Sequence, residues 1–363
     1  MPTPKLTDPW ELGSLRVPNR VLLAPLAGIG NWFVRLQAKR HGAGMAVSEM
    51  VSSHAIHYRN ERTCRELLRI HPDERGAAVG APACPTSIQL FGQDPEVMRS
   101  AAAAAVAAGA DAIDLNMGCP VPKVCKTGAG AALLADPQRA VAVARAAVLG
   151  ATDAGGEAQG GVGVRGGAVV PVTVKLRSGQ RTGDTSGFEL AHRLVEEAGV
   201  AAIAFHPRSA AVHHKGVPDY ALAARLAASL PAPVILTGGM NDARSVREAF
   251  ARTGVAAVML ARGCLGNPWL FEELVHGRAS PPTPVEVLAE LHWVIERAAE
   301  HLGAERAARY LRKFYPWYLP RLGLDKARLA RLQAALQASG TLAEARDLLD
   351  CSPPLGAPAA LAA

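Results

Sequence analysis

The sequence predicts an α/β fold, namely a (β/α)8 TIM barrel followed by an all-helical C-terminal domain. Short apolar or β-branched runs recur along the chain, and a helical pattern follows each of them, which is typical of a parallel sheet. Eight such runs are present, the number of strands that closes this kind of barrel. The 363 residues exceed the roughly 250 of one barrel, which leaves room for a second, smaller domain.

The eight predicted strands are bounded by Gly, Pro or Asp and alternate with helices. They cover residues 20–26, 45–50, 86–91, 111–116, 171–177, 201–206, 233–238 and 256–262. In such a barrel the active site lies at the carboxyl ends of the strands, because the strand-to-helix loops converge there.

A proline-rich run at residues 280–284 ends the alternation, and only helical patterns follow it. We therefore expect a catalytic barrel over residues 1–280 and a helical domain over residues 285–350. The Pro- and Ala-rich tail, residues 351–363, is expected to be disordered. The glycine-rich segment 150–167 holds few large apolar residues, so we interpret it as a flexible loop.

The composition, 49% hydrophobic and 20% charged, is that of an ordinary globular α/β enzyme. A net charge of +7 favours an acidic partner such as nucleic acid. The six cysteines form no CxxC pair, and neither an export signal nor a membrane span is apparent. We therefore expect a cytoplasmic protein without a disulfide framework, a bound metal or membrane contact. A monomer is the default expectation for its oligomeric state.

Nearly every predicted strand stops on a functional side chain or on a glycine. The positions are Pro25, Leu26, Ala27, Glu49, Met50, Gln89, Asn116, Lys175, Arg177, His206, Gly238, Gly239, Ala261 and Arg262. Polar residues commonly end strands where water begins, and this explains any one position but not the whole set. The set therefore favours a binding site at this end of the barrel.

The turns after the seventh and eighth strands, residues 237–239 and 261–263, lie where barrels often bind a phosphate. Arg262 can add a charged pair of donors, so a mononucleotide such as FMN would fit. The alternative is that the glycines serve only tight turns. Lys175 and Gln89 suit the polar edge of a flavin ring, since a buried lysine is costly without an anion or a cofactor.

Three histidines lie at the end of the sixth strand or shortly after it. His206 could donate to the phosphate or ribityl oxygens of the cofactor, or it could be a hydrogen-bonded residue of the core. His213 and His214 are adjacent and cannot present two ligands on one face. We therefore expect no metal site here.

Cys119 lies between Gly118 and Pro120 on a loop that leaves the fourth strand toward the expected site. A free cysteine is most often an inert buried residue, but this position makes the thiol accessible and fixes its backbone. A thiol is mostly protonated at neutral pH, so Cys119 can act as a general acid unless nearby cations favour the thiolate. Asn116 carries both a donor and an acceptor, as reading a pyrimidine edge requires.

Residues 306–331 carry eight Lys or Arg against one acidic residue, Asp325. The aromatic residues among them are Tyr310, Phe314, Tyr315, Trp317 and Tyr318. This combination suits phosphate contacts and base stacking on RNA. The alternative is an amphipathic helix whose aromatic rings face the core and whose charges are solvated.

Together these residues resemble the tRNA-dihydrouridine synthase family, in particular its bacterial B-type branch, over residues 16–350. The most specific motifs are residues 24–28 (APLAG), 48–53 (SEMVSS), 116–120 (NMGCP), 174–177 (VKLR), 205–209 (FHPRS) and 266–269 (GNPW), with 312–313 and 317–318 in the helical domain. Several independent motifs in the same order make a chance similarity very improbable.

The resemblance implies that FMN, reduced by NADPH, passes hydride to C6 of a flipped-out uracil in tRNA while Cys119 protonates C5. The residues that it implies for FMN are Pro25, Leu26, Ala27, Gln89, Lys175, His206, Thr237, Gly238, Gly239, Ala261 and Arg262. Those expected to contact the tRNA are Asn116, Lys123, Lys126, Arg177, Arg208, Arg312 and Lys313. The family also suggests a D-loop uridine as the target.

Two alternatives remain at this point. Another FMN barrel, such as a dihydroorotate or dihydropyrimidine dehydrogenase, would act on a free small molecule and would not need the basic helical domain. A tRNA-binding protein that keeps the fold without the chemistry would not need Cys119, Lys175 and His206.

Overall fold

The computed structural model describes residues 4–75, 84–157 and 169–351. The chain divides into two compact units. The first holds the chain up to Ala261 together with Leu274–His276, and the second holds Arg262–Glu273 and the chain from Gly277 onward. The functional boundary expected between residues 280 and 285 stays a prediction.

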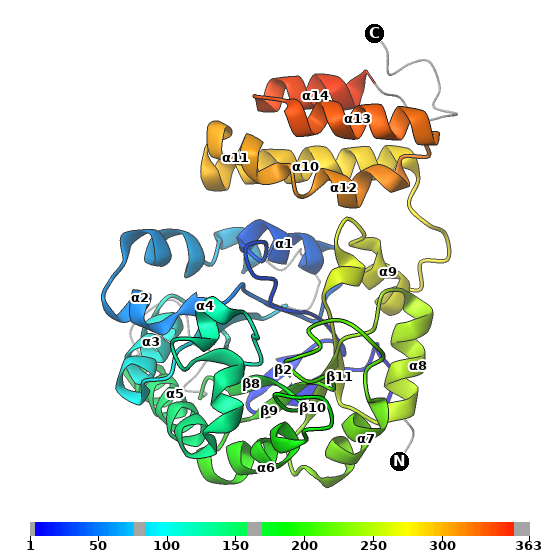
Figure 1. Cartoon of the computed structure of the whole chain (residues 1–363). Helices are drawn as coiled ribbons and strands as arrows, with labels where there is room; N and C mark the ends of the chain where they lie inside the picture. The colour runs from blue at the N-terminus through cyan, green and yellow to red at the C-terminus, as the bar shows by residue number, and fades with distance from the viewer. Residues whose placement is uncertain (1–3, 76–83, 158–168, 352–363) are drawn as a thin grey trace. The chain divides into compact units, whose positions relative to one another are not determined.

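A closed barrel of parallel strands forms the first unit, as predicted (Figure 1). Its strands are β3 (Val21–Leu23), β4 (Met45–Val47), β5 (Val51–Ser52), β6 (Thr86–Phe91), β7 (Ala112–Met117), β8 (Val172–Arg177), β9 (Ala202–His206), β10 (Val234–Thr237) and β11 (Ala257–Leu260). Strand β11 pairs with β3, which closes the ring. Both β4 and β5 pair with β6 and together take the place of one predicted strand.

A two-stranded hairpin, which the sequence did not predict, precedes the barrel. It consists of β1 (Trp10–Leu12) and β2 (Leu15–Val17). The side chains of Trp10, Leu12 and Val17 belong to a buried cluster with the first residues of β4, β7, β9 and β11. The hairpin therefore closes the amino end of the barrel, and the carboxyl end is left to the strand-to-helix loops.

Helices follow the strands around the barrel. They are α1 (Trp32–Arg40), α2 (Ser53–His57), α3 (Pro95–Ala107), α4 (Pro122–Cys125), α5 (Pro137–Glu157), α6 (Ser186–Ala198), α7 (Tyr220–Ser229) and α8 (Ala243–Thr253). A π turn covers Thr63–Leu67, and 3-10 turns cover Pro72–Glu74 and Gly130–Ala135. Asp94 caps α3 by accepting two backbone N–H groups, and Gly254 ends α8 in the left-handed conformation.

Helix α5 contradicts the loop prediction for residues 150–157. Ala151 is fully buried, and Gly150 lies against the backbone of Arg99 in α3, where a larger residue would clash. Arg99 also forms an ion pair with Asp153 at 2.7 Å. Small residues therefore serve close packing of α3 on α5 here, and this packing outweighs their weak helix propensity. Residues 158–167 lie outside the described part of the chain.

The second unit is helical, as predicted. It holds most of α9 (Trp269–Val275), whose last two residues belong to the first unit. Its other helices are α10 (Pro284–Leu302), α11 (Ala304–Leu311), α12 (Tyr315–Tyr318), α13 (Lys326–Ala338) and α14 (Leu342–Asp350), with 3-10 turns at Arg262–Cys264 and Leu319–Arg321. Thr283 and Glu286 form a capping box at the start of α10, with Pro284 in the first turn. Residues 352–363 of the predicted tail lie outside the described ranges. Within those ranges, no helix is long and apolar enough to cross a membrane.

Candidate active site at the carboxyl ends of the strands

The parallel register brings the central predicted residues together. Asn116 on β7 lies opposite Lys175 on β8, and Arg177 lies opposite His206 on β9. Gln89 comes from β6, the strand on the other side of β7. Side chains two residues apart on a strand face the same side, so these residues share the inside of the barrel near its carboxyl end.

A chain of hydrogen bonds runs from a buried carboxylate to the Cys119 loop. The Oδ2 atom of Asp114 accepts from Nε2 of Gln89 at 2.6 Å, and its Oδ1 atom accepts from the Thr173 hydroxyl at 2.5 Å. The Oε1 atom of Gln89 accepts from Nδ2 of Asn116 at 2.9 Å. The Oδ1 atom of Asn116 in turn accepts from the backbone N–H of Cys119 at 2.9 Å.

Sequence reasoning missed Asp114 and Thr173, although a signal was present. Strand β7 reads Ala-Ile-Asp-Leu-Asn-Met, so Asp114 and Asn116 alternate with apolar residues on one face. An acidic residue inside an apolar strand needs partners, and the neighbouring strand supplies Thr173.

Lys175 is the cation at the centre of the site. Burial lowers the pKa of Lys175 to about 8, and Arg177 acts in the same direction, whereas Asp114 and Cys119 oppose the shift. Burial likewise raises the pKa of Asp114, against the effects of its hydrogen bonds and of Lys175. Within the described residues, the ammonium group of Lys175 makes no hydrogen bond or ion pair, which suits an anionic ligand.

The loop that carries Cys119 is held on several sides. Besides the bond to Asn116, the carbonyl of Gly118 accepts from Nε of Arg177 at 2.9 Å. The carbonyl of Cys119 accepts from the backbone N–H of Ala131 at 3.0 Å and from the Cys125 thiol at 3.3 Å. Cys119 is half-buried, and its backbone is held on both sides.

Gly130 is the tightest point of this loop. Its φ is +63°, and a Cβ atom there would stand 2.7 Å from the Cys119 carbonyl oxygen. We expect Gly130→Ala to lower the free energy of unfolding by about 1–3 kcal/mol and to displace Cys119. Gly128→Ala is the control, because Gly128 shares the positive φ of +81° but meets only the Gln93 side chain. Equal urea midpoints and equal Cys119 alkylation rates for both variants would contradict this expectation.

Arg177 and Arg208 are buried and serve the loop after β9. Arg177 donates from Nη1 to the carbonyls of Ser209 at 3.1 Å and His213 at 2.7 Å. Arg208 donates from Nη2 to the carbonyl of Gly216 at 2.6 Å. Burial lowers the pKa of Arg177 to about 10, so its guanidinium remains charged at neutral pH. In this structure both side chains thus hold the backbone of the loop after β9 in place.

His206 is neutral in this environment. Burial and the neighbouring cations Lys175, Arg177 and Arg208 hold the pKa of His206 far below its usual range. Nη1 of Arg208 lies 3.2 Å from Nε2 of His206 and can only donate, so the imidazole proton belongs on Nδ1. His206 can therefore offer one hydrogen-bond donor to a ligand, and its ring stacks on that of His214 with 6.1 Å between centroids.

Of the two turns expected to bind a phosphate, the one after β10 contains two glycines with positive φ. Gly238 and Gly239 adopt φ of +98° and +80°, and the hydroxyl of Tyr220 donates to the Gly238 carbonyl at 3.0 Å. Thr237 is buried at the end of β10. The start of α8 is already capped by Asp242, whose carboxylate lies where an anion would bind that helix, so the turn itself must supply the donors.

The remaining residues predicted for the cofactor lie beside the neighbouring strand ends. Leu26 is buried, Pro25 is half-buried and Ala27 is exposed directly after β3. The next N–H group, that of Gly28, donates to the Glu49 carboxylate at 2.8 Å, which orders this loop. Ala261, half-buried, follows β11 in the first unit, whereas Arg262 is exposed and belongs to the second unit.

Of the other four residues predicted to contact tRNA, three are exposed to solvent and one is half-buried. Lys123 and Lys126 are exposed on α4 and just after it. Arg312 is half-buried and donates to the Ser339 carbonyl at 2.9 Å, whereas Lys313 is exposed and lies 3.7 Å from the centroid of the Tyr310 ring.

The aromatic residues of the helical unit mostly belong to its core. Phe314, Tyr315 and Tyr318 are buried, so the stacking interpretation is wrong for these three rings, which instead support the fold. Tyr310 and Trp317 are half-buried. The amphipathic alternative therefore describes most of this segment, because burial of large aromatic area stabilises a small helical domain.

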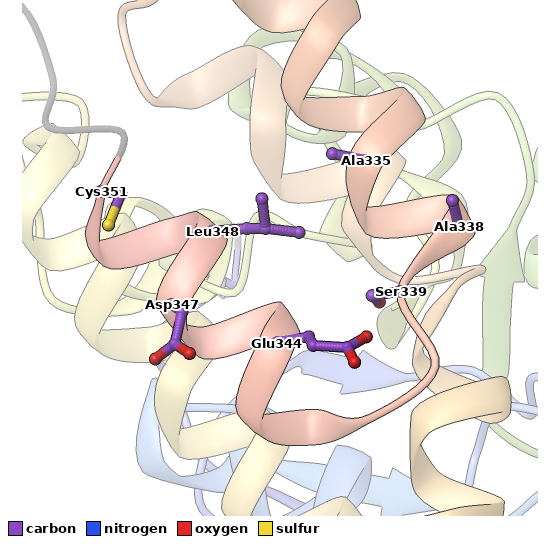
Figure 2. Close-up of a pocket in the computed structure, with 7 residues that line it drawn as sticks. All are labelled: Ala335, Ala338, Ser339, Glu344, Asp347, Leu348 and Cys351. Carbon is purple, nitrogen blue, oxygen red and sulfur yellow. The ribbon is translucent and has the colours of Figure 1, made fainter.

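A surface pocket of about 450 Å³ lies within the second unit, between α13 and α14 (Figure 2). Its lining residues are Ala335, Ala338, Ser339, Glu344, Asp347, Leu348 and Cys351. The lining carries two carboxylates and no cation, which disfavours a nucleic acid or a phosphate there. Among the described residues, no group of three His, Cys, Asp or Glu side chains is arranged to hold a metal ion.

A family model described as dihydrouridine synthase (Dus) matches residues 22–350. The chain belongs to the dihydrouridine synthase family. Among its relatives, tRNA-dihydrouridine synthase B of Pseudomonas aeruginosa is 35% identical over 319 residues, which cover 86% of this chain and 87% of that protein. The protein of the same name from Xanthomonas campestris pv. campestris is 33% identical over 363 residues, covering 96% of this chain and 100% of that protein.

Solved structures agree with the fold of this family member. A 2-naphthoyl-CoA reductase in complex with 2-naphthoyl-CoA has a TM-score of 0.55 at 14% identity, covering 76% of this chain and 52% of that chain. A morphinone reductase variant in complex with tetrahydroNAD has a TM-score of 0.51 at 17% identity, covering 78% of this chain and 94% of that chain. At these identities the likeness concerns the barrel fold alone.

Proposed function

We propose that this dihydrouridine synthase reduces the C5–C6 double bond of a uridine in tRNA, with FMN as cofactor, NADPH as reductant and Cys119 as proton donor. The observation that supports this most is the Cys119 thiol on a braced loop, within electrostatic reach of Lys175 and Arg177. A base that enters this end of the barrel would meet a fixed proton donor. The names of the relatives supply the substrate class.

The residues present fit a flavin mononucleotide. Lys175 offers a buried cation for the electron-rich edge of the ring, and His206 offers one neutral donor. The turn at Gly238 and Gly239 has positive φ at both residues, and its backbone N–H groups would be the donors to a phosphate. The backbone after β3 and Ala261 with Arg262 would complete the binding set. When bound, FMN would supply the hydride for C6 of the uracil.

The step that the protein's own side chains would carry out is the donation of a proton to the base. Cys119 would donate its S–H proton to C5, and the thiolate left behind would lie in the field of Lys175 and Arg177, which stabilises it. The Oδ1 atom of Asn116 accepts from backbone N–H groups, and its Nδ2 atom donates to Gln89. The Asn116 side chain therefore holds the Cys119 loop in place. The direct base contact expected for Asn116 stays a prediction.

We propose that the helical domain, residues 285–350, binds the tRNA and that the barrel, residues 1–280, is the catalytic domain. Lys313 offers an exposed cation there, and Lys123 and Lys126 offer two beside the Cys119 loop. Such charges would bind the phosphate backbone with a strong salt dependence and without sequence preference. We further propose that the protein acts as a monomer in the cytoplasm.

The test of this function uses the purified flavin-loaded protein, NADPH and an unmodified tRNA transcript. Nucleoside mass spectrometry is expected to detect uridine that has gained two hydrogens. A yellow protein that oxidises NADPH but leaves both the transcript and tRNA from a dihydrouridine-deficient strain unchanged would refute the proposal. It would favour an FMN-dependent reductase of a free small molecule, and a colourless protein that binds tRNA would favour the non-catalytic alternative.

The ionisation of Lys175 gives a pH test of cofactor binding. Its ammonium group is charged below its pKa of about 8 and loses its charge as the pH rises through that value. We expect FMN affinity, measured by flavin fluorescence quenching, to fall about tenfold between pH 7 and 9.5 as a charge-assisted contact is lost. Lys175→Met should bind weakly and with little pH dependence over this range. A wild-type affinity that is flat with pH would argue against contact between Lys175 and the cofactor.

A further inference from the structure

We propose that Asp114 is a positioning residue whose carboxylate orients the Gln89 amide and, through Asn116, the backbone of Cys119. The inference deepens the proposed function, because it concerns the proton donor of that reaction. Its evidence, however, is the hydrogen-bond chain inside the barrel, which holds for this molecule whatever the substrate.

The polarity of the chain follows from its two ends. An ionised carboxylate can only accept, so the Gln89 atom 2.6 Å from Asp114 must be the NH2 nitrogen. The Gln89 carbonyl then faces Asn116 and accepts from its NH2 group. At the other end a backbone N–H can only donate, which requires the Asn116 oxygen to face Cys119. Both amides are thereby fixed in one of two orientations that have nearly the same shape.

Asp114 selects the orientation of Gln89, as the backbone N–H groups do for Asn116 at the other end of the chain. A side-chain amide can turn by 180° without a change of volume, so packing alone does not choose between its two states. If Gln89 turned, its NH2 group would face the NH2 group of Asn116, and that bond would be lost. Asn116 would then be free to turn away from the N–H groups of Gly118 and Cys119, which it now holds at 3.2 and 2.9 Å.

Stability alone is a weak reason for a carboxylate at this place. Asp114 is 1% exposed, and burial of a charge is costly even when it is paired. An apolar residue of similar size often serves a core as well or better. Lys175 is the charged group that faces Asp114, and Thr173 and Gln89 are the polar groups bonded to it. A role as a mere counter-charge to Lys175 is therefore the rival explanation.

The positioning role and the counter-charge role predict different results for Asp114→Asn. In Asp114→Asn the new carbonyl can still accept from Gln89, while the new NH2 group donates to the Thr173 hydroxyl, which can turn to the Ile113 carbonyl at 3.4 Å. The orientation of Gln89 survives and only the charge is lost. In Asp114→Leu both the charge and the orientation are lost. Thr173→Val is the matched control, since it removes one partner of Asp114 and leaves the bond to Gln89 intact.

The first readout is the alkylation rate of Cys119 by iodoacetamide, followed by peptide mass spectrometry with the exposed Cys64 as the internal reference. Release of the loop in Asp114→Leu is expected to raise the Cys119 rate by about fivefold or more, because local opening exposes the thiol. Asp114→Asn and Thr173→Val should stay within roughly twofold of wild type. If Asp114→Leu does not fold, Gln89→Met breaks the same chain one link further on and should raise the rate in the same way.

The second readout is dihydrouridine formation at saturating NADPH. Asp114→Leu is expected to lower kcat by about tenfold to a hundredfold with little change in KM for tRNA, as misplacement of a reacting group does. Asp114→Asn should recover most of this loss. A Cys119 rate that does not change in Asp114→Leu, an asparagine variant as impaired as the leucine variant, or an equal effect of Thr173→Val would each overturn the proposal. A wild-type protein without tRNA activity would refute the proposed function, while the alkylation contrast would still decide the inference.

Discussion

Replacement of Cys119 by alanine is expected to lower dihydrouridine formation by about a hundredfold to ten-thousandfold, the usual contribution of a positioned general acid. The thiol is the acidic group that the loop after β7 carries into the site, and its backbone is fixed through Asn116 and Ala131. Reduction of the flavin by NADPH needs no proton from this thiol. The rate of flavin bleaching by NADPH should therefore change by roughly twofold at most, which separates the two half-reactions.

Cys125→Ala is the matched control for this experiment. Cys125 is also half-buried, lies six residues further on and donates only a weak hydrogen bond to the Cys119 carbonyl, at 3.3 Å. We expect this variant to keep product formation within a fewfold of wild type. Rapid single-turnover sampling of tRNA, analysed by nucleoside mass spectrometry, measures the effect. Unchanged product formation by Cys119→Ala would assign the proton to another donor.

Arg177→Met is expected to have the second largest effect, on both stability and activity. The guanidinium donates to the carbonyls of Gly118, Ser209 and His213, and these join the Cys119 loop to the loop after β9. Their loss leaves the buried carbonyls of Gly118 and Ser209 without these donors, so the free energy of unfolding should fall by about 2–4 kcal/mol. Product formation should fall by about a hundredfold, because Cys119 is no longer held.

Arg181→Met provides the comparison. Arg181 is exposed and lies four residues beyond Arg177, so its loss should change the free energy of unfolding by no more than about 0.5 kcal/mol. Urea denaturation followed by circular dichroism measures stability, and nucleoside mass spectrometry measures activity. Arg177→Lys should not restore function, since an ammonium group cannot reproduce the planar fork. Wild-type behaviour of Arg177→Met in both assays would mean that Arg177 does not brace the site.

Much of the fold follows from local patterns in the sequence. Apolar runs that alternate with helical patterns predicted the closed barrel, and the proline-rich run at residues 280–284 preceded α10 as expected. The prediction of secondary structure was wrong where tertiary contacts outweigh the local conformational preference of the residues. Gly150 and Ala151 lie within α5 because small residues allow close packing on α3, and no pattern within the segment reveals that neighbour.

The candidate site, like the fold, was predictable from the sequence only in part. Strand ends identified Lys175, Gln89, Asn116 and His206, because the topology of a parallel barrel dictates where strands finish. The direction of the hydrogen bonds among them was not predictable, since it depends on Asp114, whose partners come from two other strands.

By itself, the sequence of this protein determined the barrel, the helical domain, the family motifs and the position of Cys119 at the end of a strand. All of these depend on residues that are close along the chain or on a periodic pattern. Only the tertiary structure decided that Arg177 and Arg208 face inward, that Phe314, Tyr315 and Tyr318 are core residues, and that His206 is neutral. Burial and charge environment are sums over neighbours distant in sequence, and only folding brings those neighbours together.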